Sequence, residues 1–223
     1  MKIISLATLL SKQTSKFINR HENDEVFILS PLEDEELFNR IKNHHFLKYE
    51  IDTLGFVLAL VCARLLPDFM EIDEGYLSGE SNAGDEEIDE LCEFFKSCDG
   101  IIVAPENFKG ANAKNIKFML EKLSQKCGFD IIGINGKVYE LNAPSSIDKL
   151  EDGADFNGAS VFCLANESVS LKGSAMFSAA AKLKDGSELE IKNTKVKFQL
   201  DKSLKGTCGL FFAPDLEYEF IKL

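Results

Sequence analysis

Residues 100–134 read Gly100-Ile-Ile-Val-Ala-Pro-Glu-Asn-Phe-Lys-Gly-Ala-Asn-Ala-Lys-Asn-Ile-Lys-Phe-Met-Leu-Glu-Lys-Leu-Ser-Gln-Lys-Cys-Gly-Phe-Asp-Ile-Ile-Gly-Ile134. The apolar run 100–104 ends at a proline and predicts a buried strand. Residues 113–126 carry apolar side chains at helical spacing, and Gly128 follows as a stop signal. A second apolar run, 129–134, predicts another strand. Strand, helix and strand with short connections form a βαβ unit, so we expect parallel strands with a right-handed crossover.

The residues before this unit show a similar alternation of strands and helices. A short buried strand is expected over 25–30, up to Pro31, and a helix over 34–42. A strongly apolar helix should run from 52 or 53 to about 66, with Thr53 as its cap and Pro67 as its stop. Another helix is expected over 85–97. The pattern predicts Rossmann-like α/β units at 25–70 and 84–134, within a region spanning 25–140.

The first 24 residues resemble a signal peptide only superficially. Their apolar stretch is short, and Lys12, Lys16 and Arg20 follow where a cleavage site of small residues should stand. Apolar positions fall near helical spacing, so we expect an amphipathic N-terminal helix over 1–24. A cytoplasmic protein follows from this interpretation.

The last forty residues contain strand patterns separated by turns. Asp185-Gly186 is a tight-turn dipeptide, alternating runs follow it, and Lys205-Gly206 precedes a last apolar run that closes at Pro214. Residues 141–158 carry turn-forming residues and predict a linker. We therefore expect a small antiparallel, β-barrel-like module over 159–223.

Composition and charge narrow the function classes. Of 223 residues, 45% are hydrophobic and 28% charged, as in ordinary globular proteins, and no apolar run is long enough to span a bilayer. The net charge is −12, and residues 71–99 contain eleven acidic residues against the single basic Lys96. Nucleic-acid binding is disfavoured, because phosphate contacts need clustered Lys and Arg. The acidic segment is open to two interpretations: a solvated helix face beginning near Asp85, or a docking surface for a basic partner.

No residue is predicted to be catalytic, cofactor-binding or metal-ligating. The six cysteines lie at wide, irregular intervals without a C-x-x-C pair, which favours buried structural thiols over a zinc or iron–sulfur site. His44 and His45 are adjacent, which makes a poor ligand pair, and we expect them to interact with a helix C-terminus. Ser145-Ser146 and Ser174 are explained as turn and cap residues, and Gly79, Gly84 and Gly110 as turn glycines.

Three regions, in order, resemble the molybdopterin oxidoreductase superfamily, which includes the large cluster-bearing subunit of bacterial respiratory complex I. The first contains Leu47-Lys-Tyr-Glu-Ile-Asp-Thr-Leu-Gly-Phe56 and the second Gly110-Ala-Asn-Ala-Lys-Asn-Ile116, which is similar to the middle domain of that large subunit in epsilon-class proteobacteria. The third is the β module. The resemblance covers most of the chain as an ordered pattern, without a diagnostic motif.

The chain also departs from that family. It has no N-terminal cluster domains with their cysteines, and Glu50-Ile51-Asp52-Thr53 replaces a Pro-Gly-Thr-Asp turn without its glycine. No G-x-G-x-x-G follows a strand, so no dinucleotide or flavin phosphate site is prepared. The resemblance thus implies a scaffold relative without redox centres, and we expect no cofactor.

The leading hypothesis is an accessory subunit of the peripheral arm of an NADH-quinone oxidoreductase, without activity alone, on the cytoplasmic face of the inner membrane. Its partners would be other complex I subunits, the large cluster-bearing subunit above all, and a carrier such as flavodoxin docking at the basic N-terminal segment. The alternative is a small flavin- or pterin-binding oxidoreductase with its site after Ala104 and Ile134. A freestanding assembly factor is a third hypothesis.

Overall fold

A computed structural model describes residues 1–223, except for the side chains of residues 15 and 16. The chain forms two compact units, Met1–Ala154 and Asp155–Leu223. The division falls inside the 141–158 segment that the sequence predicts to be a linker.

The first unit is built on a five-stranded sheet in which every strand is parallel to its neighbours. Its order is β3-β2-β1-β4-β5. The strands are β1 (Lys2–Ser5), β2 (Glu25–Ser30), β3 (Asn43–Lys48), β4 (Gly100–Val103) and β5 (Asp130–Gly133). This order is that of a doubly wound Rossmann sheet, so the expected α/β fold class is confirmed.

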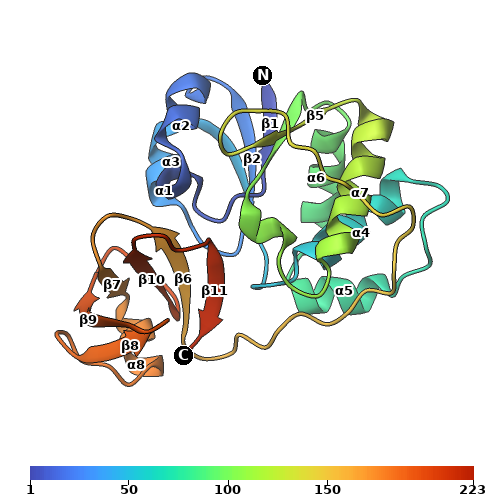
Figure 1. Cartoon of the computed structure of the whole chain (residues 1–223). Helices are drawn as coiled ribbons and strands as arrows, with labels where there is room; N and C mark the ends of the chain where they lie inside the picture. The colour runs from blue at the N-terminus through green and yellow to red at the C-terminus, as the bar shows by residue number, and fades with distance from the viewer. The chain divides into compact units, whose positions relative to one another are not determined.

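Helices cover both faces of the sheet (Figure 1). On one face a core cluster joins the sheet to α1 (Leu10–Gln13), α2 (Ser15–His21) and α3 (Glu35–Arg40). On the other a larger cluster includes α4 (Leu54–Leu65), α6 (Asp85–Phe95) and α7 (Ala113–Cys127). Helix α5 (Glu74–Ser81) packs against α4, and the short 3₁₀ helix η1 (Pro105–Phe108) follows β4. In the part of the chain described here, no helix is both long and apolar enough to cross a membrane.

The expected N-terminal helix over 1–24 is wrong in its first part. Residues 2–5 form β1, the central strand, and only α1 and α2 are helical. Ile3 packs into the core on one face of the sheet and Ile4 into the core on the other. A strand covered by helices on both faces buries side chains on both sides, as Ile3 and Ile4 do here, so its sequence does not show the alternation of a half-exposed strand.

Local signals elsewhere predict the elements well. The helices expected over 85–97 and 113–126 correspond to α6 and α7, with Gly84 capping α6 and left-handed Gly128 capping α7. Thr53 is the N-cap residue of α4, although its hydroxyl donates to the Glu50 carbonyl instead of capping the helix. Between the units predicted over 25–70 and 84–134 lies an additional helix, α5, whose N-cap Asp73 accepts a hydrogen bond from the Tyr76 amide.

The second unit is a curled six-stranded sheet of order β11-β6-β10-β7-β9-β8, which confirms the barrel-like module. Its elements are β6 (Ser160–Ala165), β7 (Ser170–Gly173), α8 (Ala175–Ala180), β8 (Glu188–Ile191), β9 (Thr194–Leu200), β10 (Cys208–Ala213) and β11 (Glu219–Lys222). The sheet is mixed rather than wholly antiparallel, because β6 pairs with β10 and β7 with β9 in parallel. Alternation along a strand reports which face is buried and carries no information on the direction of its neighbour.

Phe177 of α8 is the central core residue of the second unit. It is fully buried, and a Cβ atom built at Gly173 or Gly209 would lie within 2.9 Å of its ring. These two glycines therefore make room for the ring. Ser174 caps α8 by accepting a hydrogen bond from the Phe177 amide at 3.0 Å, as expected for a cap residue.

Candidate functional site

The first place to look for a site is the carboxyl edge of the parallel sheet between β1 and β4. The connection after β1 runs over one face of the sheet, through α1 and α2, and that after β4 over the other, through α7. Ligands of open α/β sheets bind in the crevice at such a switch point.

In this chain the side chain of Glu106, on η1, occupies that edge. Its Oε1 accepts hydrogen bonds from the backbone amide of Thr8 at 3.1 Å and from Gln13 Nε2 at 2.6 Å. The neighbouring Asn107 donates to the Leu6 carbonyl at 2.7 Å. The loop after β4 is thereby tied directly to the loop after β1.

A carboxylate at this position opposes a phosphate ligand. Glu106 accepts from the Thr8 amide, the type of donor that a Rossmann protein offers to a cofactor phosphate. Burial raises the pKa of the Glu106 carboxyl. Helix α1, which follows β1, is only four residues long, and no side chain caps its start, so it offers a phosphate little helix dipole.

Two oxygen atoms at this edge lack hydrogen-bond partners. They are Glu106 Oε2 and Gln13 Oε1, both buried among the residues described. Leaving a buried acceptor unpaired costs about 1–3 kcal/mol. Ser5 Oγ, at the end of β1, is a third buried oxygen without a partner among the described residues. A hydrogen-bond donor from outside would stabilise these atoms.

The other polar groups along the edge serve the fold. Ser11 donates to Asp34 from both its amide and its hydroxyl, and Asp34 in turn caps α3. The Ser30 hydroxyl bonds the Thr8 carbonyl. Burial raises the pKa of Tyr49, with smaller contributions from the Glu106 and Asp52 carboxylates.

The turn Glu50-Ile51-Asp52-Thr53 contains a strained residue. Asp52 adopts a left-handed backbone with φ of 68°, and its Oδ2 accepts from the Ala154 amide at 2.8 Å. Gly110 lies so close that a Cβ atom there would stand 2.3 Å from Asp52 Oδ1. The turn glycine at 110 is thus required by φ of 80° and by this close approach.

The histidines lie within the edge strand β3, and the expected interaction with a helix C-terminus is confirmed for His44 alone. His44 still donates from Nδ1 to the Ile41 carbonyl, at the C-cap of α3, at 2.7 Å. His45 contacts Glu90 at 2.6 Å. Neighbouring residues of a strand point to opposite faces, which separates the two imidazoles.

The cysteines are free thiols, and all but the half-buried Cys127 are buried. Burial raises the thiol pKa to about 11 for Cys92 and to about 12 for Cys98 and Cys208. Such thiols stay protonated at neutral pH and are weak nucleophiles. Across the described residues, no three His, Cys, Asp or Glu side chains are grouped to hold a metal ion.

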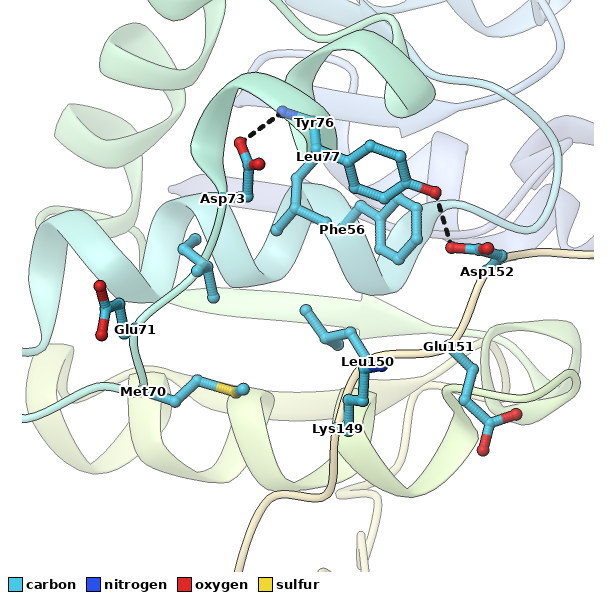
Figure 2. A pocket seen from close by; sticks show the side chains of 11 residues that line it. Phe56, Met70, Glu71, Asp73, Tyr76, Leu77, Lys149, Leu150, Glu151 and Asp152 are labelled. Atoms are coloured by element: carbon cyan, nitrogen blue, oxygen red, sulfur yellow. Dashed lines mark hydrogen bonds between the residues drawn. The ribbon is translucent and has the colours of Figure 1, made fainter.

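A pocket of about 490 Å³ lies at the helical side of the first unit, between α4, α5 and the segment 149–152. Leu77, Leu150 and Met70 point toward its middle in Figure 2, and Phe56 of α4 lies behind them. The remaining lining residues are Glu71, Ile72, Asp73, Tyr76, Lys149, Glu151 and Asp152. This volume is typical of ligand pockets.

Two buried asparagines of α7 and its cap hold one wall of the pocket in place. Asn112 donates to the Glu151 carbonyl at 2.6 Å and accepts from the Glu151 amide at 3.1 Å. Asn115 accepts from the Asp148 amide at 2.9 Å. The segment 148–151 has no regular secondary structure, so these amides satisfy backbone groups that no helix or sheet would satisfy.

The pocket is acidic. Four of its lining residues are Asp or Glu and one, Lys149, is basic. The Tyr76 hydroxyl donates to Asp152 Oδ1 at 2.7 Å, which joins α5 to the opposite wall and raises the Tyr76 pKa to about 12 (Figure 2). Glu71 lies at the other end, so carboxylates flank an apolar middle.

The sequence patterns do not point to this pocket. Its two walls come from residues 70–77, which lie almost wholly between the two predicted α/β units, and from residues 149–152, which lie in the predicted linker. The available signal is the pair Asn112 and Asn115, at the start of a helix where both side chains are buried. Buried amides need partners, and here the partners are remote backbone groups.

Comparison with known proteins adds no relative: no protein-family model matches the chain, and no curated protein matches it significantly.

Proposed function

We propose that the chain is an accessory, non-catalytic subunit of the peripheral arm of a complex I-type NADH-quinone oxidoreductase. In this role it binds other subunits, the large cluster-bearing subunit above all, and supports electron input to the respiratory chain from the cytoplasmic face of the inner membrane. Placement in this complex rests on the resemblance described above. The proposal that the chain has no activity on its own rests on the contacts of Glu106 at the carboxyl edge of the sheet.

One observation supports the proposal that the chain is not catalytic. The Glu106 carboxylate bonds the Thr8 amide at the switch point, where a phosphate-bearing cofactor would lie in a Rossmann enzyme. Bringing a phosphate there would place two anions together in a poorly solvated environment. That is unfavourable without a compensating cation.

The test is affinity purification of the tagged chain from solubilised membranes, with an absorption spectrum of the chain after separation from its partners. We expect complex I subunits to co-purify and the separated chain to be colourless. Recovery of the chain alone, under conditions that preserve the complex, would refute the proposal. Loss of the chain from the mature complex but not from its precursors would assign it to assembly.

A second candidate, a small flavin- or pterin-binding oxidoreductase, is favoured by the unpaired oxygens of Glu106 and Gln13. The N–H edge of a pterin or isoalloxazine ring would supply the donors that these atoms lack. An absorption band near that of a flavin or pterin in the purified chain would establish this candidate, and its loss in Glu106→Ala would place the ring at the edge.

Docking of a carrier such as flavodoxin at the N-terminal segment remains part of the proposal. Lys12 is paired with Glu36 at 2.7 Å, Arg20 is exposed, and the side chain of Lys16 lies outside the described residues. Flavodoxins are acidic, so this segment suits them better than the acidic surface does. Cross-linking of flavodoxin at Arg20→Cys, but not at Glu86→Cys, is the expected result.

A further inference from the structure

We infer that the pocket between α4, α5 and residues 149–152 is a docking site for a partner's segment that carries apolar side chains flanked by lysine or arginine. This inference deepens the proposed function, on which it rests, by naming the surface and the chemistry through which the subunit binds.

We infer apolar side chains in the partner because the middle of the pocket is apolar. Leu77 is buried under it, whereas the lining residues Met70, Ile72 and Leu150 are only partly covered. Met70 and Leu150 point toward the middle of the pocket in Figure 2. Two leucine-sized side chains fit within about 490 Å³. Their burial would remove water from both surfaces, which is the main source of affinity in such contacts.

We infer basic residues on both sides of the partner's apolar side chains because both ends of the pocket carry carboxylates. Glu71 lies at one end and is exposed, and Glu151 and Asp152 lie at the other and are also exposed. In Figure 2 the carboxylates of Glu71 and Glu151 point outward on opposite sides of the apolar middle. An extended segment with basic residues before and after an apolar pair matches this order.

The acidic residues around the pocket also favour binding of a basic partner over an acidic one. Residues 71–99 carry eleven acidic residues and one basic residue. Arg64 faces three of these carboxylates, Glu74, Asp85 and Asp89, and so is already neutralised by them. An acidic partner would meet repulsion at both ends of the pocket.

The walls are suited to hold a fixed shape. Asn112 and Asn115 bond the backbone of 148–151, and Tyr76 bonds Asp152 across one end. A pocket whose walls are already held by hydrogen bonds loses little entropy on binding, which raises affinity.

The experiment measures binding of labelled ten-residue peptides to the full chain by fluorescence polarisation. The probe has two leucines with two lysines on each side. One comparison peptide replaces the lysines with glutamates, and the other replaces the leucines with serines. We expect binding of the first only, with affinity that falls steeply between about 0.1 M and about 0.5 M salt because exposed charges are screened.

Charge-reversed variants locate the site. Glu71→Lys with Glu151→Lys should weaken binding of the lysine peptide at least tenfold and favour the glutamate peptide. The control, Glu86→Lys with Glu167→Lys, changes the net charge equally at exposed positions outside the pocket lining and should stay within twofold of the unaltered chain.

No binding of the lysine peptide, or an equal loss in both double variants, would overturn the inference. The same two variants in the membrane purification separate it from the proposed function. If both double variants still co-purify with complex I subunits, the proposed function stands and the docking site is refuted. If the peptides bind as expected but neither the unaltered chain nor either double variant co-purifies with the complex, the docking site stands and the assigned complex is wrong.

Discussion

At the scale of single residues, Glu106 is the most informative side chain of the first unit. It bonds Thr8 and Gln13 through one oxygen and leaves the other without a partner. Burial raises the pKa of this carboxyl group, because it penalises the charged form. Protonation of Glu106 is therefore coupled to the folding of the first unit.

The first prediction concerns this coupling. The folded pKa of Glu106 is raised above its ordinary value of 4.5, so the folded state holds the proton more tightly than the unfolded chain. The associated stability is complete below that ordinary value and is lost as pH rises through the folded pKa. Glu106→Gln abolishes this titration while keeping an oxygen for Thr8.

We expect the free energy of unfolding of Glu106→Gln, relative to the unaltered chain, to increase with pH above about 4.5, by at most about 1.4 kcal/mol per pH unit. Urea denaturation at several pH values measures this difference. Glu86→Gln, on the exposed face of α6, should give a curve parallel to that of the unaltered chain. Parallel curves for Glu106→Gln as well would show that its pKa is not raised.

At the scale of elements, the packing of α4 against α7 depends on one close approach. A Cβ atom on Gly55 would lie 2.8 Å from the Cβ of Asn112, the residue that holds the pocket wall. Helix α4 is buried almost throughout, so it has no free side to which it can shift. The glycine thus sets the distance between the two helices.

The second prediction compares two glycines of neighbouring helices. Gly55→Ala should lower the free energy of unfolding by about 1–3 kcal/mol, because the methyl group overpacks the α4–α7 contact. Gly79→Ala, in α5, meets no atom within 4 Å and should raise it by about 0.5–1 kcal/mol, because alanine favours the helix. Urea denaturation of both variants measures these changes. Equal changes in the free energy of unfolding for the two variants would argue against the close approach of Gly55 to Asn112.

A third prediction tests the wall of the pocket. Asn115→Ala removes the partner of the Asp148 amide and should cost about 1–3 kcal/mol of stability while increasing hydrogen exchange at 148–151. Asn43→Ala, at an exposed strand end, should change the stability by no more than about 0.5 kcal/mol and leave that exchange unaltered. Unchanged protection in Asn115→Ala would mean that the segment is held by other contacts.

At the scale of the whole molecule, the two units have separate cores. The second unit buries its own cluster around Phe177, Phe198 and Phe211. Near its start, Phe156 packs edge-on against Phe220 with ring centroids 6.0 Å apart. A core of this kind is sufficient for folding, although small domains are only marginally stable.

The fourth prediction is that a chain of residues 155–223 folds alone, with a dispersed amide NMR spectrum and cooperative thermal unfolding. A shorter chain, 159–223, loses the Phe156–Phe220 contact and should be less stable by about 0.5–1.5 kcal/mol. A disordered spectrum for 155–223, with the full chain folded, would show that this unit needs the first.

Strands and helices can be predicted from the sequence where buried apolar residues recur at the regular spacing of the element itself. The strands over 25–30 and 100–104 and the helix over 113–126 are recognisable because their apolar spacing and their Pro or Gly stops lie within the segment itself. Prediction fails at residues 2–5, where burial on both faces removes the alternation, and at α5, whose few buried residues give no apolar stripe.

The amino-acid sequence by itself determined the Rossmann-like α/β character of the first unit, the barrel-like second unit and the excess of acidic residues at 71–99. Only the tertiary structure decided that β1 is the central strand, that β6 lies parallel to β10, and that Glu106 meets Thr8 at the switch point. It also brought residues 70–77 and 149–152 together around a pocket. The physical reason is that periodicity and stop signals report the surroundings of a segment along its own axis, whereas pairing partners and pockets arise from contacts between segments far apart in the chain.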